Sequence, residues 1–170
     1  MKKEIIFDSS SLILLAKIGL LDKIAHYLQK IAITEQIYNE CVMPKDSFDA
    51  KIIKKRVEEK LIGTRTVKDQ HLCQKIKDDF NLGKGEAEGI AFCMENKIGF
   101  VTDDKKAMSA CRILNIEFTT ALNLIIISHN RSVINKKEAE AYIGKLENFG
   151  RYSKELLQKC KEELKNDKDE

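Results

Sequence analysis

The sequence predicts an α/β protein in which helices cover both faces of a parallel β-sheet, followed by further helices. Short apolar runs alternate with helical patterns up to about residue 129, an order that is typical of a parallel sheet. The chain has 170 residues, of which 43% are hydrophobic, enough for one sizeable core. A single proline and eight glycines favour long regular elements over a turn-rich all-β fold.

Five short strands are expected, over residues 5–7, 31–33, 61–67, 98–102 and 116–119. The first is a continuous apolar run, which suits a strand buried on both faces. Because each strand is followed by a helical pattern, the strands are expected to run parallel.

Helical spacing and capping residues occupy the segments between the strands. The serines at positions 9–11 are expected to be N-caps of the first helix, and Gly19 is expected to end it. Thr34 is expected to cap the helix that carries Glu40, and Pro44 to end that helix. Further helices are expected over residues 20–28, 46–60, 69–80, 86–95, 107–114 and 120–127.

No strand pattern follows residue 130. Two amphipathic helices are expected there, one with apolar residues between positions 139 and 149 and one between 156 and 164. Gly150 is expected to end the first, and the charged tail 165–170 is expected to fray. We therefore expect an α/β domain over residues 1–129 and a C-terminal helical extension over residues 130–170, packed on the same domain.

Composition excludes several classes of protein. No apolar run approaches the roughly 20 residues that span a bilayer, and only three apolar residues precede Asp8, so we expect no membrane span, no signal peptide and a cytoplasmic location. The five cysteines are scattered without a C-x-x-C pair, which disfavours a disulfide framework or a zinc ribbon. The three histidines form no metal-binding motif, so oxygen ligands and Mg²⁺ or Mn²⁺ are favoured over Zn²⁺.

Four acidic residues stand out from the solvated surface. Asp8 and Asp103 directly follow apolar strands, and the carboxyl ends of parallel strands share the edge where ligands bind. Glu40 and Glu86 border the apolar faces of their helices, from which a carboxylate can lean toward that edge. The four side chains are therefore candidates for one site.

Each of these acids also has an ordinary explanation. Asp8, Asp103 and Asp104 could be helix caps, Glu40 a solvated helix residue, and Glu86 a first-turn acid favoured by the helix dipole. Together they are harder to explain, because two like charges about 4 Å apart repel by roughly 4 kcal/mol at an effective dielectric near 20. A divalent cation between the carboxylates, or protonation of some of them, would relieve that repulsion.

Other sites with recognisable motifs are disfavoured. The glycines at 83, 85 and 89 do not follow a strand as a dinucleotide fingerprint requires, and Lys84 is followed by Gly85 and not by the Ser or Thr of a phosphate loop. We interpret these glycines as a tight entry into a helix. The first strand also lacks the D-x-D of a haloacid-type hydrolase.

Three stretches, in this order and spacing, resemble those of PIN-domain proteins, specifically of a prokaryotic subgroup with a C-terminal helical extension. They are residues 6–19, 82–88 and 101–107, with weaker similarity over residues 34–42 and 150–153. The resemblance covers nearly the whole chain. It implies a three-layer α/β/α sandwich around a parallel sheet, which agrees with the alternation of strands and helices.

The resemblance also implies an activity, the divalent-metal-dependent cleavage of single-stranded nucleic acid, most often RNA. The family's catalytic acids fall on Asp8, Glu40, Glu86 and Asp103, and its metal ligands on Asp8, Glu86, Asp103 and Asp104. Many relatives have Asp where this chain has Glu86. Asp103 is preferred to Asp104 as the fourth acid because it directly ends the strand.

Supporting roles follow from the same resemblance. Ser9 or Ser10 is expected to bond the first Asp or a substrate phosphate, and Thr102 to support the last acid. We therefore expect a metal-dependent endoribonuclease that uses Mg²⁺ or Mn²⁺ to activate water and hydrolyse phosphodiester bonds. Many relatives are toxins neutralised by a small antitoxin protein, and many form homodimers, so both kinds of partner are expected.

The alternative is a catalytically inactive PIN-like module that binds nucleic acid or protein. An aromatic content of 6% and the absence of Trp provide no obvious platform for stacking RNA bases, which favours this alternative. Retention of all four acid positions favours the enzyme, and the division of charge suits a nucleic-acid substrate. If four of the 27 acids occupy one pocket, the other 23 and the 30 basic residues leave +7 outside it, although the net charge is only +3. A negative pocket within a mildly basic shell suits a polyanion that binds through metal.

Overall fold

The computed structural model describes residues 4–43, 46–149 and 152–166 of the chain. The chain divides into two compact units, residues 1–121 and residues 122–170, and each is described by itself. The elements are β1 (Ile5–Phe7), α1 (Ser9–Ile18), α2 (Leu21–Leu28), β2 (Ile31–Thr34), α3 (Glu35–Val42), α4 (Phe48–Glu58), β3 (Ile62–Arg65), α5 (Gln70–Phe80), α6 (Lys84–Asn96), β4 (Gly99–Val101), α7 (Lys105–Ile113), β5 (Phe118–Thr119), α8 (Ala121–Asn130), α9 (Lys136–Glu147) and α10 (Lys154–Asn166).

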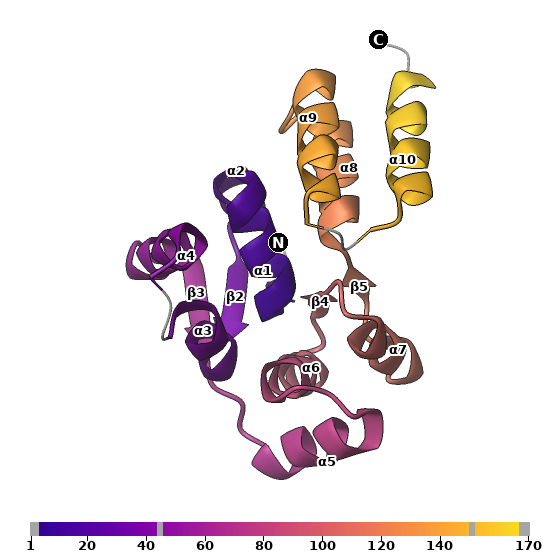
Figure 1. The fold of residues 1–170 in the computed structure, drawn as a ribbon. Coiled ribbons are helices and arrows are strands. Elements are labelled where there is room, and N and C mark those ends of the chain that lie inside the picture. The colour runs from indigo at the N-terminus through magenta and orange to yellow at the C-terminus, as the bar shows by residue number, and fades with distance from the viewer. Residues whose placement is uncertain (1–3, 44–45, 150–151, 167–170) are drawn as a thin grey trace. The chain divides into compact units, whose positions relative to one another are not determined.

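The first unit is built on a five-stranded sheet of order β3-β2-β1-β4-β5, in which every neighbouring pair is parallel. Helices α1 and α2 lie on one face and α6 on the other (Figure 1). This arrangement confirms the predicted three-layer α/β/α fold. It also confirms the five strands, although β3, β4 and β5 are shorter than the segments predicted for them.

Apolar side chains of the central strands and of the helices that pack on them form the core. Ile6, Phe7, Ile33, Phe100 and Val101 are fully buried, as expected for strands covered on both faces. The five cysteines are free and buried, which agrees with their interpretation as small core residues.

The start of α1 differs from the predicted serine cap and agrees with the ordinary explanation of Asp8 as a helix cap. Asp8, not a serine, is the N-cap: its backbone is extended (φ −75°, ψ 163°) and its side chain accepts a hydrogen bond from the Ser11 backbone N–H. A cap residue must leave the strand with non-helical angles, and only Asp8 stands at that junction, so the three serines form the first turn of α1. Gly19 ends the helix in the left-handed conformation (φ 81°), as predicted.

The start of α6 also differs, because the helix begins at Lys84, two residues before the predicted start. Gly83 is its N-cap, and the Glu86 side chain accepts a 2.7 Å hydrogen bond from the Gly83 backbone N–H. This contact replaces the intrahelical partner that a first-turn N–H lacks. The predicted helix end at Pro44 lies outside the described residues.

The second unit contains α9, α10 and nearly all of α8. The Leu122 backbone N–H donates to the Tyr152 hydroxyl at 3.1 Å, and Ile143, Leu146 and Leu157 are buried. Gly150 and residues 167–170 lie outside the described residues, and the packing of the extension on the first domain stays a prediction. Across the described ranges, no helix is both long and apolar enough to cross a membrane.

Candidate active site

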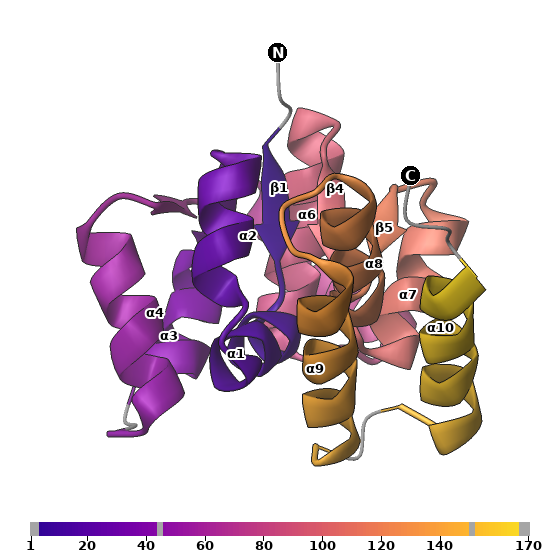
Figure 2. The same ribbon diagram turned by 90° about the horizontal axis from the view of Figure 1, so that it is seen from above.

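The candidate site lies at the switch point of the sheet, from which the strand order runs to β2 and β3 on one side of β1 and to β4 and β5 on the other. Strand β1 pairs with β2 on one side and with β4 on the other, and Phe7 is opposite Val101. Asp8 and Thr102 therefore leave neighbouring strands side by side at the carboxyl edge. In open α/β sheets this switch point is the usual position of a ligand site. Figure 2 shows α1 turning back from the end of β1 at this edge.

Asp8 is fully buried and receives several hydrogen bonds. Its Oδ1 accepts from the Ser11 backbone N–H at 2.6 Å, and its Oδ2 accepts from the Thr102 hydroxyl at 2.6 Å and from the Ser10 hydroxyl at 3.1 Å. The carboxyl group is thus fixed from both strands and from α1.

Burial raises the pKa of Asp8 from 3.8 to about 6. The hydrogen bonds from Thr102 and Ser11 act in the opposite direction, and the negative charge of Asp103 adds a further increase. Since burial outweighs these donors, the hydrogen bonds compensate the ionised carboxylate poorly.

Ser11 joins Asp8 to Asp103. While its backbone N–H donates to Asp8, its hydroxyl donates to Asp103 Oδ2 at 2.6 Å. The backbone N–H of Ala121, at the start of α8, lies 3.2 Å from the other oxygen of Asp103. Ser11 is fully buried, and the sequence interpretation missed its bridging role because it considered only Ser9 and Ser10 as supporting residues.

Thr102 connects the first acid to the last pair. Its hydroxyl donates to Asp8 and accepts from the Asp104 backbone N–H at 3.1 Å. Asp104 itself is the N-cap of α7 and accepts from the Ala107 backbone N–H at 2.8 Å. Of the two neighbouring acids, Asp103 is the one that shares a donor residue, Ser11, with Asp8.

Glu40 reaches the same edge from α3. Its carboxylate accepts from the Ser9 hydroxyl at 2.9 Å, from the Gly85 backbone N–H at 3.0 Å and from the Gln36 side chain at 3.2 Å. A Cβ atom at position 85 would overlap the Glu40 carboxylate, so glycine is what allows α6 to approach this closely. Glu40 thus links α1, α3 and α6.

Glu86 combines a structural contact with an unfavourable electrostatic environment. Burial raises its pKa, and the charges of Asp104 and Glu40 raise it further, against the opposing effects of the Gly83 N–H and Lys106. Glu86 therefore lies close enough to Asp104 and Glu40 for their negative charges to raise its pKa. The ordinary explanation of Glu86 as a first-turn acid also holds, since it belongs to a capping box.

The predicted acids thus gather at one edge in two groups, Asp8 with Asp103, and Glu86 near Glu40 and Asp104. Over the described part of the chain, no three His, Cys, Asp or Glu side chains are grouped tightly enough to enclose a metal ion. The donor chemistry nevertheless fits a hard divalent cation, because the acids offer only oxygen and two of them have raised pKa values. Metal binding by Asp8, Glu86, Asp103 and Asp104 stays a prediction.

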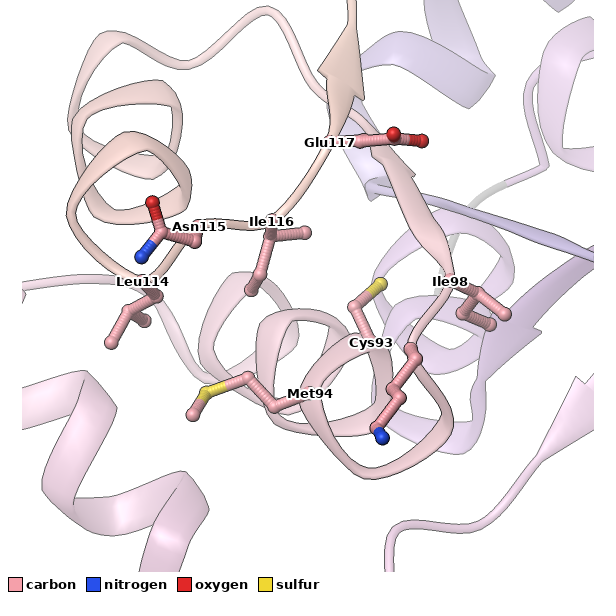
Figure 3. Close-up of a pocket in the computed structure, with 8 residues that line it drawn as sticks. Cys93, Met94, Ile98, Leu114, Asn115, Ile116 and Glu117 are labelled. Atoms are coloured by element: carbon pink, nitrogen blue, oxygen red, sulfur yellow. The ribbon is translucent and has the colours of Figure 1, made fainter.

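A separate pocket of about 340 Å³ lies at the opposite edge, where α6 and α7 end and β4 and β5 begin (Figure 3). Its lining includes Cys93, Met94, Leu114 and Ile116, with Glu117 as its one acidic residue. Burial raises the pKa of the Cys93 thiol, so this thiol is not an activated nucleophile. The pocket contains neither a reactive group nor a cluster of acids.

A solved structure supports the fold. PAE2754 from Pyrobaculum aerophilum has a TM-score of 0.56 and 15% sequence identity, and the match covers 74% of this chain and 96% of that one. No curated protein matches the chain.

A family comparison supports the assignment more directly. The family model DUF3368, described as a PIN domain, matches residues 4–166. PIN domains are generally nucleases, and they typically use divalent metal ions. Since the match extends over almost the whole chain, the protein belongs to the PIN-domain family.

Proposed function

We propose that this protein is a divalent-metal-dependent endoribonuclease that hydrolyses phosphodiester bonds in single-stranded RNA. The observation that carries the proposal is the pairing of Asp8 with Asp103 at the switch point, with Ser11 donating to both carboxylates. Membership of a family of nucleases supports the same conclusion. If Asp8 were only the cap of α1, its buried carboxylate would not need a second acid, Asp103, beside it.

Asp8, Asp103, Glu86 and Asp104 are the residues that would hold Mg²⁺ or Mn²⁺. A bound ion would supply charge neutralisation at the phosphate and a water molecule of lowered pKa. Ser11 and Thr102 orient the carboxylates by donating to them. Of the two predicted serines, Ser9 donates to Glu40 at 2.9 Å, whereas Ser10 is half-buried and donates to Asp8 at the longer distance of 3.1 Å. The Ser10 hydroxyl is therefore the better placed of the two to donate to a substrate phosphate.

The direct test is cleavage of a mixed-sequence single-stranded RNA in Mn²⁺ or Mg²⁺. The wild type should cleave only with metal, and Asp8→Asn or Asp103→Asn should lower the rate by at least about 100-fold, since each removes a charged ligand. Asp78→Asn is a matched control, because Asp78 is exposed and, among the described residues, accepts a hydrogen bond from Gln74 alone. Binding of RNA without cleavage, unchanged by Asp8→Asn, would instead support the inactive binding module.

The proposal extends to a cellular role as the toxin of a toxin–antitoxin pair, acting as a homodimer in the cytoplasm. Expression of the wild type alone should arrest bacterial growth, and Asp8→Asn should relieve the arrest. Light scattering coupled to size-exclusion chromatography tests the dimer. Growth arrest by both forms would separate toxicity from nuclease activity.

A further inference from the structure

Three lysines lie next to the acids in the chain, at the starts of two helices at the carboxyl edge of the sheet. Helix α6 leads into β4 and α7 follows it, so both helices begin at this edge. Lys84 is the first residue of α6, and Lys105 and Lys106 are the first two of α7. All three are exposed. We name Lys84, Lys105 and Lys106 the lysine rim.

The lysine rim does not neutralise the acids by direct pairing. Lys106 Nζ donates to the backbone carbonyl of Asn81 at 3.3 Å and lies near enough to Glu86 to lower its pKa. Lys84 lines a small pocket of about 100 Å³, and Lys77 and Glu88 also line it. Among the residues that the structure describes, Lys84 and Lys105 form no ion pair.

Some lysines elsewhere on the surface do pair with carboxylates. Examples are Lys51 with Asp46, Lys75 with Asp79 and Lys161 with Glu147. At these positions the charge is compensated locally, although such a pair contributes little to stability. The lysine rim keeps its charge available although carboxylates are near.

Helix stability does not explain the position of the lysine rim. The helix dipole favours cations in the last turn and acids in the first, whereas these lysines occupy first turns. By the same principle, their placement costs roughly a few tenths of a kcal/mol, which the binding of an anion would offset.

We propose that the lysine rim binds the phosphate backbone of single-stranded RNA on either side of the bond presented to the acids. That the bound polymer is single-stranded RNA rests on the proposed function. That a polyanion near these acids requires positively charged side chains follows from electrostatics. Asp8, Glu40, Glu86 and Asp103 repel a polyanion before metal binds, and a rim of unpaired ammonium groups offsets this repulsion. Three phosphate contacts also keep the strand in register without reading its sequence.

The test measures RNA binding without cleavage. Fluorescence anisotropy of a labelled mixed-sequence single-stranded RNA is recorded in EDTA for the wild type and for Lys84→Gln/Lys105→Gln/Lys106→Gln. The matched control is Lys30→Gln/Lys54→Gln/Lys60→Gln, whose lysines are exposed, form no ion pair within the described ranges and lie away from this edge. Both variants lower the formal net charge of +3 by the same three units, so only the position of the charge differs.

The rim variant should bind at least about tenfold more weakly than the wild type, and the slope of log K against log salt should be shallower by about 2, because each phosphate contact on a single strand contributes about 0.7. The control should stay within about threefold of the wild type. Equal losses in both variants, or no RNA binding by the wild type, overturn the proposal. Metal-dependent cleavage is measured separately: a wild type that binds through the lysine rim but never cleaves contradicts the nuclease activity and leaves the rim intact.

Discussion

The Ser11 hydroxyl donates a 2.6 Å hydrogen bond to Asp103, a residue 92 positions later in the chain. The Ser11 backbone N–H donates to Asp8 at the same time. One residue in the first turn of α1 therefore holds together the two acids that follow the neighbouring strands β1 and β4. A mutation of the Ser11 side chain can therefore remove the contact with Asp103 and leave the backbone contact with Asp8.

Ser11→Ala should remove the bond to Asp103 while keeping the backbone bond to Asp8. A buried hydrogen bond to a charged group contributes about 1.5–3 kcal/mol, so we expect the free energy of unfolding to fall by about 2 kcal/mol and the affinity for Mn²⁺ to fall about tenfold. Urea denaturation and calorimetric titration measure the two effects. Ser10→Ala is the control, since it removes only the 3.1 Å bond to Asp8 and leaves Asp103 in place. Equal Mn²⁺ affinity in Ser11→Ala and the wild type would contradict the positioning role.

Asp8→Asn should change the pH dependence of stability in EDTA. The folded-state pKa of Asp8, about 6, lies above the ordinary aspartate value of 3.8, so the folded protein prefers the neutral carboxyl group. Stability is therefore retained below about pH 4 and decreases as the pH rises through 6, by an amount on the order of 3 kcal/mol for a shift of about two units.

Asn is also a good N-cap and carries no charge to bury. At pH 7.5 and without metal, Asp8→Asn should be more stable than the wild type, and the difference should disappear near pH 3.5. Denaturation curves at both pH values measure this. If Asp8→Asn were less stable than the wild type, and by the same amount at pH 7.5 and at pH 3.5, burial of the Asp8 charge would not be the dominant effect.

Gly85→Ala should disturb the contact between α6 and Glu40. The added Cβ would overlap the Glu40 carboxylate, and overpacking typically costs about 1–3 kcal/mol. Gly144→Ala in α9 is the matched control, because apart from its chain neighbours and the backbone of its own helix no described atom lies within 4 Å of the new Cβ, and an alanine there favours the helix by up to about 1 kcal/mol. Thermal unfolding should therefore move in opposite directions for the two variants. A stabilised Gly85→Ala would mean that Glu40 is not held against α6.

Mn²⁺ should stabilise the wild type against heat. At a concentration about 100 times the dissociation constant, a ligand that binds only the folded state adds about 2.7 kcal/mol, which for a chain of this size raises Tm by about 5 to 10 °C. Asp8→Asn should lose most of this increase, and Asp78→Asn should keep it. The same Mn²⁺-dependent increase in Asp8→Asn would place the ion elsewhere.

The positions of Asp8 and Asp103 could be predicted from the sequence because both follow apolar strands, and parallel strands end at one edge. The Ser11 bridge could not, because it depends on β1 pairing with β4, which the local pattern does not specify. The contact of Glu40 with Gly85 joins residues 45 positions apart and was hidden for the same reason. The start of α6 at Lys84 could not be predicted, because the glycines at 83 and 85 are typical of a tight entry that precedes a helix, whereas Gly83 is its cap and Gly85 lies in its first turn.

The most direct test of the account is the rate of single-stranded RNA cleavage in Mn²⁺ for the wild type and for Asp8→Asn, with EDTA added to a parallel sample. We predict cleavage by the wild type in Mn²⁺, none in EDTA, and a rate at least about 100-fold lower in Asp8→Asn. Equal rates for the two proteins, or cleavage that continues in EDTA, would contradict a metal-dependent site at the end of β1.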